Sequence, residues 1–314
     1  MRVLHSLSEI SRDKNSVVTV GTFDGIHRAH QEIIRELVNR ARMREGRSVL
    51  ITFDPHPKEV VASTRGPVRL LTTLEERIAL LEPLNVDLIF VIPFTLEFSR
   101  LTSEEFYRQY VVNGMGVSEV VVGYDHMFGR DRAAGIDELV HMGRYFDFSV
   151  FAVHAYAVDG ETVSSTRIRK ALSAGDVEHA ERLLGRPYTL AGTVVSGDRR
   201  GATLGFPTAN IQPLSEKKVT PANGVYIVAV TIGSERRYGM LNIGVLPTVT
   251  DGKNLTIEVH LFDFSGELYE KEIAVSFLRR LRDERRFSSL GELTDQLHRD
   301  REESLRYIAS YVKS

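Results

Sequence analysis

Strand-like apolar runs alternate with helical patterns along the first 184 residues, and this alternation restricts the possible fold more than any other feature. The runs are VVTVG at 17–21, SVLITF at 48–53, DLIFVIPF at 87–94, SEVVVG at 118–123 and SVFAVHAY at 149–156. Segments with helical spacing lie between them, such as LEERIALLEPL, in which Leu74, Ile78 and Leu81 share one face. Strands that alternate with helices form βαβ units, so we expect a Rossmann-like, doubly wound parallel sheet covered on both faces.

The pattern changes after Gly185, where strand-like runs follow one another closely with glycine-bearing turns between them. These runs are TLAGTVVSG at 189–197, GVYIVAVTIG at 224–233, RRYGMLNIG at 236–244, LTIEVHLFDF at 255–264 and KEIAVSFL at 271–278. Such spacing is typical of a small antiparallel β-barrel. A final amphipathic helix is expected from about 290 to 311, with an apolar side formed by Leu290, Leu293, Leu297, Leu305 and Ile308. We therefore expect two domains, 1–186 and 187–314.

The composition limits the class of protein. Of the 314 residues, 42% are hydrophobic and 26% are charged, as in soluble globular domains. The formal net charge of -2 argues against a nucleic-acid partner, which would require a strongly basic domain or face. The lack of cysteine excludes disulfides and thiolate metal sites and fits the cytosol. No apolar run has the length of a membrane span or a signal peptide, so we expect a cytoplasmic enzyme without a membrane partner.

The segment GTFDGIHRAH at 21–30 places two histidines at a strand-to-helix turn. The first backbone N–H groups of a helix are unpaired and its N-terminal dipole is positive, so an anion is favoured there. His27 and His30 lie one helical turn apart, so both imidazoles can face one pocket and donate hydrogen bonds to phosphoryl oxygens. Small residues such as Gly21 and Gly25 let a ligand approach the backbone closely. The segment therefore predicts a triphosphate site.

Two other interpretations of the histidine pair are open. Histidines spaced i, i+3 near a helix start are compatible with a solvated surface, or with half of a zinc site. The zinc interpretation is the weaker one, because the chain has no cysteine, no HExxH motif and no third ligand at a recognisable spacing.

The segment VSSTRIRKAL at 163–172 places hydroxyl and guanidinium groups at the start of another helix. Ser164, Ser165 or Thr166 can serve as an ordinary N-cap. Arg167 and Arg169, however, are unfavourable at the positive end of a helix dipole, so a bound anion would offset their charge. The segment is therefore a second candidate for phosphate binding.

Two turns that follow strands are further candidates for ligand contacts. In TFDPHP, Pro55 and Pro57 fix a rigid turn that aims His56 outward, unless the turn is only structural. In GYDHMFG, a glycine closes the strand, and Asp125 and Phe128 follow it. Ligands of parallel sheets bind at the carboxyl ends of the strands, where both turns are expected to lie.

The second domain has one glycine-rich loop and one strand with acidic residues. Gly197 and Gly201 flank an arginine pair in GTVVSGDRRGATLGFPTAN, and backbone N–H groups of such a loop can cradle phosphates, although barrel turns also use glycine. The loop lacks the GxxxxGK[ST] pattern of a P-loop. In LTIEVHLFDF, the strand period places Glu258 and His260 on one face and Asp263 on the other. A carboxylate on a half-exposed strand is usually solvated, so Glu258 alone does not define a site.

Taken together, these motifs resemble those of the bacterial bifunctional riboflavin kinase/FAD synthetase family, over about residues 15–308. GTFDGIHRAH resembles the HxGH nucleotidyltransferase signature, and VSSTRIR resembles the phosphate motif S-[ST]-T-x-[IV]-R. GYDHMFG is similar to G-x-[DN]-F-x-F-G, a loop that contacts flavin and nucleotide. GFPTAN, NIGVLPT and LTIEVHLFDF resemble the riboflavin kinase signatures G-F-P-T-A-N, N-I-G-x-[RN]-P-T and E-x-H-[IL]-F-D-F.

The resemblance implies that the first domain adenylylates FMN with ATP, which yields FAD and pyrophosphate. Residues that would bind ATP and its phosphates are Gly21, Phe23, Asp24, Ser165, Thr166 and Arg167. Residues that would contact flavin or nucleotide are Pro55, His56, Pro57, Asp125 and Phe128. His27 and His30 would stabilise the charge that develops during transfer.

By the same resemblance, the second domain phosphorylates riboflavin to FMN. Glu258 would act as the general base toward the 5′-hydroxyl. Residues that would bind ATP are Gly197, Gly201, Thr208 and Asn210, and the last two would also ligate Mg²⁺ through oxygen. Arg282 would reach the nucleotide or flavin, or belong to a solvated charged face. The expected partners are therefore small molecules, namely riboflavin, FMN and ATP.

Three positions depart from the family pattern. Ala29 replaces a glycine of the HxGH signature and adds a methyl group near the expected adenine or ribose. His126 replaces a phenylalanine that would stack on the flavin ring, and Leu246 replaces a polar residue. Two alternatives are therefore open, namely a riboflavin kinase with weakened adenylyltransferase activity and a flavin-binding regulator without turnover.

Overall fold

The chain divides into two compact units, Met1–Ser165 and Thr166–Ser314. The computed structural model of the protein describes residues 1–61, 69–124, 127, 135–196, 205–246 and 254–313. Among the helices within these residues, none combines the length and the apolar character that crossing a bilayer requires.

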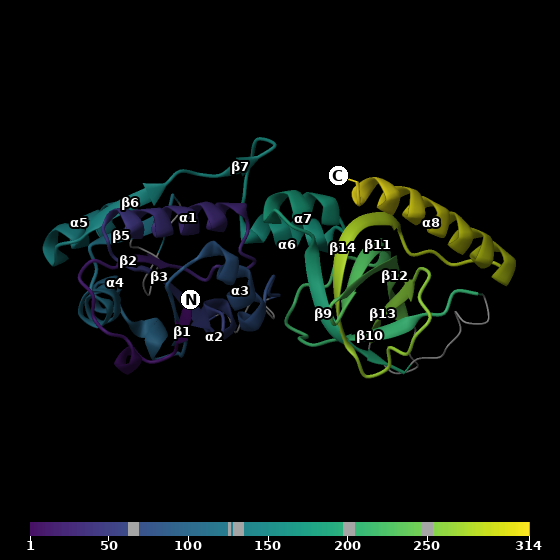
Figure 1. Ribbon diagram of the computed structural model, residues 1–314, viewed down its shortest axis with the longest axis horizontal. Coiled ribbons are helices and arrows are strands. Elements are labelled where there is room, and N and C mark those ends of the chain that lie inside the picture. Colours follow the sequence, from purple (N-terminus) through teal and green to yellow (C-terminus); the bar gives the residue numbers. More distant parts are fainter. Residues whose placement is uncertain (62–68, 125–126, 128–134, 197–204, 247–253, 314) are drawn as a thin grey trace. The chain divides into compact units, whose positions relative to one another are not determined.

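The first unit is built on a six-stranded sheet in the order β1-β4-β3-β2-β5-β6, in which every neighbouring pair is parallel (Figure 1). The strands are β1 (Arg2–Leu4), β2 (Val17–Val20), β3 (Ser48–Asp54), β4 (Leu88–Pro93), β5 (Glu119–Gly123) and β6 (Ser149–Val153). The chain order reverses at β2, because β3 and β4 lie on one side of it and β5 and β6 on the other. Open α/β sheets bind ligands at such a switch point, outside the carboxyl ends of the strands.

Helices cover both faces of this sheet. They are α1 (Arg28–Met43), α2 (Pro57–Val61), α3 (Leu74–Leu81), α4 (Ser103–Phe106), α5 (Ile136–Phe146), the short helices η1 (Leu7–Glu9), η2 (Glu82–Leu84) and η3 (Phe98–Arg100), and the π-helix η4 (Tyr107–Met115). Val18 and Val20 of β2 pack with η4 and α5, whereas Val17 packs with α1 and α3 on the opposite face. A hairpin of β7 (Ala157–Val158) and β8 (Glu161–Thr162) follows the sheet. The predicted doubly wound parallel sheet is confirmed.

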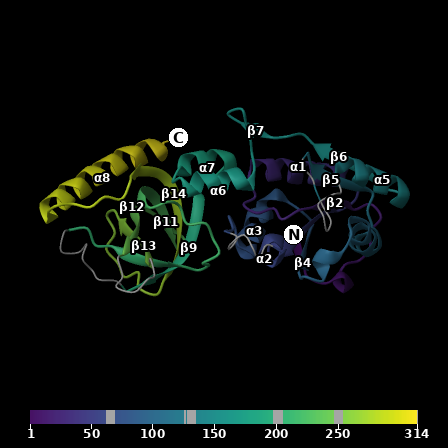
Figure 2. The same ribbon diagram turned by 180° about the vertical axis from the view of Figure 1, so that it is seen from behind.

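The second unit contains a closed barrel in the strand order β10-β13-β12-β11-β14-β9, in which every neighbouring pair is antiparallel (Figures 1 and 2). Its strands are β9 (Tyr188–Val195), β10 (Ala209–Pro213), β11 (Gly224–Ile232), β12 (Glu235–Leu246), β13 (Asn254–Leu261) and β14 (Glu272–Arg282). Helix α8 (Leu290–Tyr311) packs on the barrel through Leu297, Leu305 and Ile308. The predicted barrel and terminal helix are confirmed.

One predicted packing contact of α8 is wrong. Leu290 is 70% exposed, whereas the prediction places it on the apolar side of the helix. Leu290 is the first residue of α8, and the side chains that pack on the barrel begin later along the helix. The helical period therefore identified the apolar side correctly but not the length of helix that the barrel covers.

Two helices that precede the barrel belong to its compact unit. They are α6 (Ser165–Ser173) and α7 (Val177–Leu184). The N–H of Ala222 donates to the carbonyl of Leu172 at 3.0 Å, and Gly175 lies directly against the guanidinium of Arg280. The predicted boundary near residue 186 lies just before β9, the first strand of the barrel. The predicted domain limits, 1–186 and 187–314, stay predictions.

A bidentate ion pair attaches α8 to the barrel. Arg282 of β14 donates from Nε to both carboxylate oxygens of Asp300 at 3.2 and 3.0 Å, and from Nη2 to Oδ2 at 2.7 Å. Asp300 is 3% exposed and also accepts from Nε2 of Gln296 at 2.7 Å. The guanidinium of Arg282 is thus held by α8, which gives this arginine a structural role.

Replacement of Asp300 by alanine is expected to lower the free energy of unfolding of the barrel unit by about 3 kcal/mol, because the largely buried guanidinium of Arg282 would lose its carboxylate. Urea unfolding followed by circular dichroism measures this change. The control is Asp295→Ala, which removes an exposed aspartate from the same helix. Equal unfolding curves for the two variants would contradict a stabilising role of the ion pair.

Candidate active sites

The turn between β2 and α1 has an unusual backbone conformation. Phe23 and Ile26 have φ angles of 47° and 38°, in the left-handed region, and Gly25 has a φ of 93°. A side chain disfavours this region, yet Phe23 and Ile26 are almost fully buried, and their packing stabilises the strained backbone. The turn is therefore held in one shape by the protein itself.

Asp24 anchors this turn to the segment that precedes α3. Its carboxylate accepts hydrogen bonds from the backbone N–H groups of Leu71 at 3.0 Å and Thr72 at 2.9 Å, and from the Thr72 hydroxyl at 3.2 Å. The Thr72 hydroxyl also accepts from the N–H of Gly25 at 3.0 Å. Asp24 is therefore a structural residue of the turn, and its predicted contact with ATP stays a prediction.

The two histidines form a stacked pair at the start of α1. Their ring centroids lie 3.5 Å apart with an interplanar angle of 16°, and the edge of the Phe23 ring lies against His30. His27 is the N-cap of α1, because its Nδ1 accepts from the backbone N–H of His30 at 3.3 Å. A neutral His27 therefore carries its proton on Nε2, which makes that atom a hydrogen-bond donor.

His30 is held in its neutral form. Burial, and then the nearby His27 and Arg77, keep the pKa of His30 well below its ordinary value of 6.5. Its Nδ1 is buried and has no hydrogen-bond partner among the residues that the structure describes. Neutral imidazoles can still donate N–H hydrogen bonds to an oxyanion, so the pair suits stabilisation of a phosphate group without proton transfer.

The predicted phosphate motif at the start of α6 is joined to the same turn. The Ser165 hydroxyl donates to the backbone carbonyl of Asp24 at 2.8 Å. Thr166 and Arg167 follow Ser165 in the first turn of α6 and belong to the second compact unit. Their contacts with phosphate stay predictions.

The predicted orientation of His56 is wrong. The side chain is not aimed outward, because His56 is 5% exposed. Its Nδ1 accepts from the N–H of Lys58 at 3.1 Å, and its own N–H donates to the carboxylate of Glu59 at 3.1 Å. His56 therefore caps α2, between Pro55 and Pro57, and the contacts of all three with flavin or nucleotide stay predictions.

Several predicted site residues lie outside the described residues. They are Asp125 and Phe128 of the first unit and Gly197 and Gly201 of the second. His126, which departs from the family pattern, also lies outside them.

The barrel brings together the three predicted residues of the second site that the structure describes. The Thr208 hydroxyl donates to Oε2 of Glu258 at 3.2 Å. Asn210 of β10 lies directly opposite Glu258 of β13 in the strand register. Along β13, Glu258 is half-buried and lies between the buried Ile257 and Val259, so it is on the outer face of the barrel wall. A hydroxyl, an amide and a carboxylate therefore meet on one surface.

Two further residues adjoin this site without having been predicted as part of it. Asn242 of β12 lies opposite Glu258 on the other side of β13. His260 shares a face with Glu258, and its Nδ1 lies 2.8 Å from the carbonyl of Pro207, so an N–H at that position holds the segment next to Thr208. The NIGVLPT and LTIEVHLFDF motifs contained both residues, but only strand pairing shows that they flank the carboxylate.

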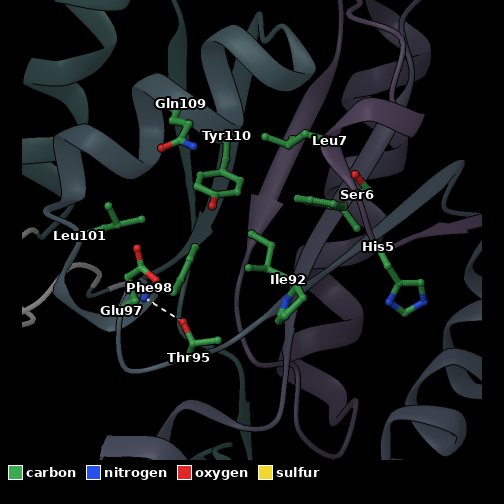
Figure 3. Close-up of a pocket in the computed structure, with 12 residues that line it drawn as sticks. His5, Ser6, Leu7, Ile92, Thr95, Glu97, Phe98, Leu101, Gln109 and Tyr110 are labelled. Atoms are coloured by element: carbon green, nitrogen blue, oxygen red, sulfur yellow. Dashed lines mark hydrogen bonds between the residues drawn. The ribbon is translucent and has the colours of Figure 1, made fainter.

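The first unit also contains a cavity of about 500 Å³ that no predicted site residue lines. Figure 3 shows Gln109 and Tyr110 on one side of this cavity, and His5 and Ser6 on another. Burial, and then the carboxylate of Glu97, raise the pKa of Tyr110. The residues come from segments around β1, β4 and η4 that carry no recognisable motif, so this cavity could not be predicted from the sequence.

Comparison with known proteins assigns a family to each half of the chain. Residues 9–167 match the FAD synthetase family, and residues 184–308 match the riboflavin kinase family. A Pseudomonas fluorescens protein named bifunctional riboflavin kinase/FMN adenylyltransferase is 40% identical over 300 residues, which are 96% of this chain and 94% of that protein. The chain belongs to the bifunctional riboflavin kinase/FMN adenylyltransferase family. The resemblance found in the sequence is therefore confirmed.

Other members of the family show similar agreement. Proteins of the same name from Listeria monocytogenes and Escherichia coli K12 are each 36% identical, over 95% and 96% of this chain and 94% and 95% of theirs. A solved structure from Streptococcus pneumoniae, named as a macrolide-efflux protein, has a TM-score of 0.86 at 34% identity, and the match covers 96% of this chain and 97% of that one. The histidine turn lies in the region that matches FAD synthetase, and Thr208 and Glu258 lie in the region that matches riboflavin kinase.

Proposed function

We propose that this chain converts riboflavin to FAD in two consecutive reactions, each at its own site. The barrel transfers the γ-phosphoryl group of ATP to riboflavin, which yields FMN and ADP. The histidine turn supports attack of the FMN phosphate on the α-phosphorus of a second ATP, which yields FAD and pyrophosphate. The observation that carries this proposal is the presence of two clusters of chemically suitable groups, the His27–His30 pair and the Thr208–Glu258 pair, on different folds of a chain in this family.

In the kinase reaction, Glu258 has the chemistry to orient the 5′-hydroxyl of riboflavin and accept its proton. Phosphoryl transfer depends mainly on positioning and on charge neutralisation, so a single carboxylate next to the nucleophile suffices as the base. The hydrogen bond from Thr208 fixes one oxygen of Glu258 and leaves the other available to the substrate. Residues Thr208 and Asn210 would hold the phosphates of ATP.

The oxygen donors of this site fit Mg²⁺. Thr208, Asn210 and Glu258 present hydroxyl, amide and carboxylate oxygens, which are the ligands that this hard cation prefers. Thr208 and Asn210 are the residues that we propose as ligands. When bound, Mg²⁺ would neutralise part of the charge on the phosphates of ATP.

In the adenylyl-transfer reaction, charge develops on the oxygens of the α-phosphate and of the leaving pyrophosphate. The Nε2–H of His27 and an N–H of His30 would donate to these oxygens, and the N-terminus of α1 adds a favourable dipole. The bond from the α-phosphorus to the bridging oxygen breaks as the bond to FMN forms, so neither histidine has to transfer a proton. The Ser165 hydroxyl is bound to the turn and would lie near the phosphates.

The matched regions favour this function over a kinase with weakened adenylyltransferase activity. Both halves of the chain match their families over most of their length, and the relatives carry both activities in their names. Ala29, the departure nearest the histidines, lies in the first turn of α1 and leaves the stacked pair intact. We place both reactions in the cytoplasm, with riboflavin, FMN and ATP as the small-molecule substrates.

A time course with purified protein, riboflavin and MgATP tests the proposal. Separation of the flavins by chromatography should show FMN first and FAD after it, because FMN is the product of one site and the substrate of the other. A parallel reaction without ATP is the control. Accumulation of FMN without FAD would favour the kinase alone, and unchanged riboflavin would contradict both activities.

A further inference from the structure

Arg77 is a buried charge whose position the proposed reaction does not yet explain. The side chain is 1% exposed and belongs to the same face of α3 as Leu74 and Leu81, three residues after the first and four before the second. No carboxylate among the described residues forms an ion pair with it. Burial of a guanidinium is unfavourable unless hydrogen bonds or nearby opposite charges compensate for its lost hydration.

The contacts of Arg77 lead to the histidine turn. Its Nη1 donates to the Thr52 hydroxyl at 2.9 Å and to the carbonyl of Phe53 at 3.2 Å. The Thr52 hydroxyl in turn donates to the carbonyl of Thr22 at 3.1 Å. A chain of hydrogen bonds therefore runs from α3 through the end of β3 into the turn that carries His27. The segment before α3 also holds this turn, through hydrogen bonds to Asp24. The turn is therefore connected to α3 and to the segment before it by two separate sets of hydrogen bonds.

The charge of Arg77 also acts on the histidine pair. Two protonated imidazoles with centroids 3.5 Å apart would repel each other, so the stacked geometry disfavours protonation of both rings at once. The groups that act on His30 are His27 from the turn and Arg77 from α3, and both oppose its protonation. The nearby acidic groups, Asp24, Asp54, Glu59 and Glu75, act instead on Arg77, where they favour its charged form against the effect of burial.

We propose that Arg77 is a positioning residue of the adenylyl-transfer site, which fixes the turn through Thr52 and whose positive charge acts on His30. This proposal rests on the proposed function of the histidine pair. Arg77 need not touch ATP or FMN. Arg77 would affect the reaction indirectly, because it sets the position of Thr22 and influences the charge state of His30.

The proposal has a definite sign for the dependence on pH. FAD formation that uses neutral His30 is retained at neutral pH and lost as the pH falls through the lowered pKa of this residue. Removal of the positive charge at position 77 raises that pKa, so the loss would begin at a higher pH. A purely structural arginine would lower the rate by the same factor at every pH.

The test compares three variants of the full-length chain. Arg77→Met removes the charge and the hydrogen bonds, Arg77→Lys keeps a charge, and Thr52→Val keeps Arg77 but removes the hydroxyl that contacts Thr22. The control is Arg108→Met, which removes a half-exposed arginine from η4. For each, kcat and KM for FAD formation from FMN and MgATP are measured between about pH 5 and pH 9, and the His30 imidazole is titrated by NMR.

We expect Arg77→Met to move the acid limb of kcat and the NMR titration of His30 upward together, because a positive charge that opposes protonation of His30 is lost. Arg77→Lys should leave both near their wild-type positions. Thr52→Val should lower kcat for FAD formation by about tenfold without a move of the acid limb, because only the position of the turn changes. Phosphorylation of riboflavin by the same preparations should be unchanged, since that site lies in the other unit.

An unmoved His30 titration in Arg77→Met would overturn the proposal. If Arg77→Met does not fold, Thr52→Val decides, and wild-type kcat in that variant would equally overturn it. If the wild-type chain forms no FAD from FMN, the proposed function fails, whereas the NMR titration of His30 in Arg77→Met still tests the action of the charge. The two failures are thus distinguishable.

Discussion

Replacement of Glu258 by glutamine is expected to lower the rate of FMN formation from riboflavin by about a thousandfold, because glutamine cannot accept the proton of the 5′-hydroxyl. FAD formation from supplied FMN should continue at the wild-type rate. The substitution keeps the size of the side chain and its oxygen, so Thr208 can still donate a hydrogen bond to it. Chromatography of the flavins after incubation with MgATP, starting once from riboflavin and once from FMN, measures both rates.

A matched substitution separates the loss of a base from a general effect on the barrel. Glu235→Gln changes a largely exposed carboxylate on β12, which pairs with Arg237 at 2.7 Å. It should leave both rates unchanged, because a surface ion pair contributes little to stability. Loss of both activities in Glu258→Gln would argue against independent sites. Retention of FMN formation would show that another group accepts the proton.

The sequence predicted the elements that repeat a clear period. The central strands of the sheet and the bounds of α8 followed from runs in which apolar residues recur over several turns or alternations. Strand β1 has only three residues, and β10 has the sequence ANIQP, which is not an apolar run, so neither shows a strand pattern. Their place in the fold is set by pairing with β4, β9 and β13, which the sequence does not display.

The sites were predictable where a motif and a fold agreed. The His27–His30 pair and the Thr208–Glu258 contact connect residues that the motifs singled out. His56 was predicted wrongly because the turn prolines indicate a loop but not which way its side chains face. In the folded chain, the imidazole accepts a hydrogen bond from the N–H of Lys58 in α2 and is buried, while the backbone N–H of His56 donates to Glu59.

Arg77 shows a different limit of sequence interpretation. Its position between Leu74 and Leu81 places a charge on the apolar side of a helix, and this signal is visible in the sequence. Its meaning depends on Thr52 and Thr22, which are distant along the chain and meet Arg77 only through the packing of α3 against β3. Residues that act through other residues therefore carry weaker sequence signals than those that belong to motifs.

Replacement of His30 by alanine is expected to lower the rate of FAD formation from FMN by about a hundredfold to a thousandfold, because one hydrogen-bond donor to the developing phosphate charge is lost. FMN formation from riboflavin should be unchanged. The control is His141→Ala, which removes an exposed histidine from α5 in the same unit. The two half-reactions, measured by chromatography of the flavins, report the loss and the control in one preparation.

A second substitution at this position distinguishes a neutral donor from a charged one. Glutamine offers a neutral N–H, so His30→Gln should recover part of the rate that His30→Ala loses. Because the pKa of His30 is held well below 6.5, wild-type kcat should not fall as the pH rises from about 6 to about 8. A requirement for imidazolium would give the opposite sign, since activity would then be lost as the pH rises and glutamine would recover nothing. That result would contradict the neutral pair, and with it the part of the proposal in which the charge of Arg77 acts on His30.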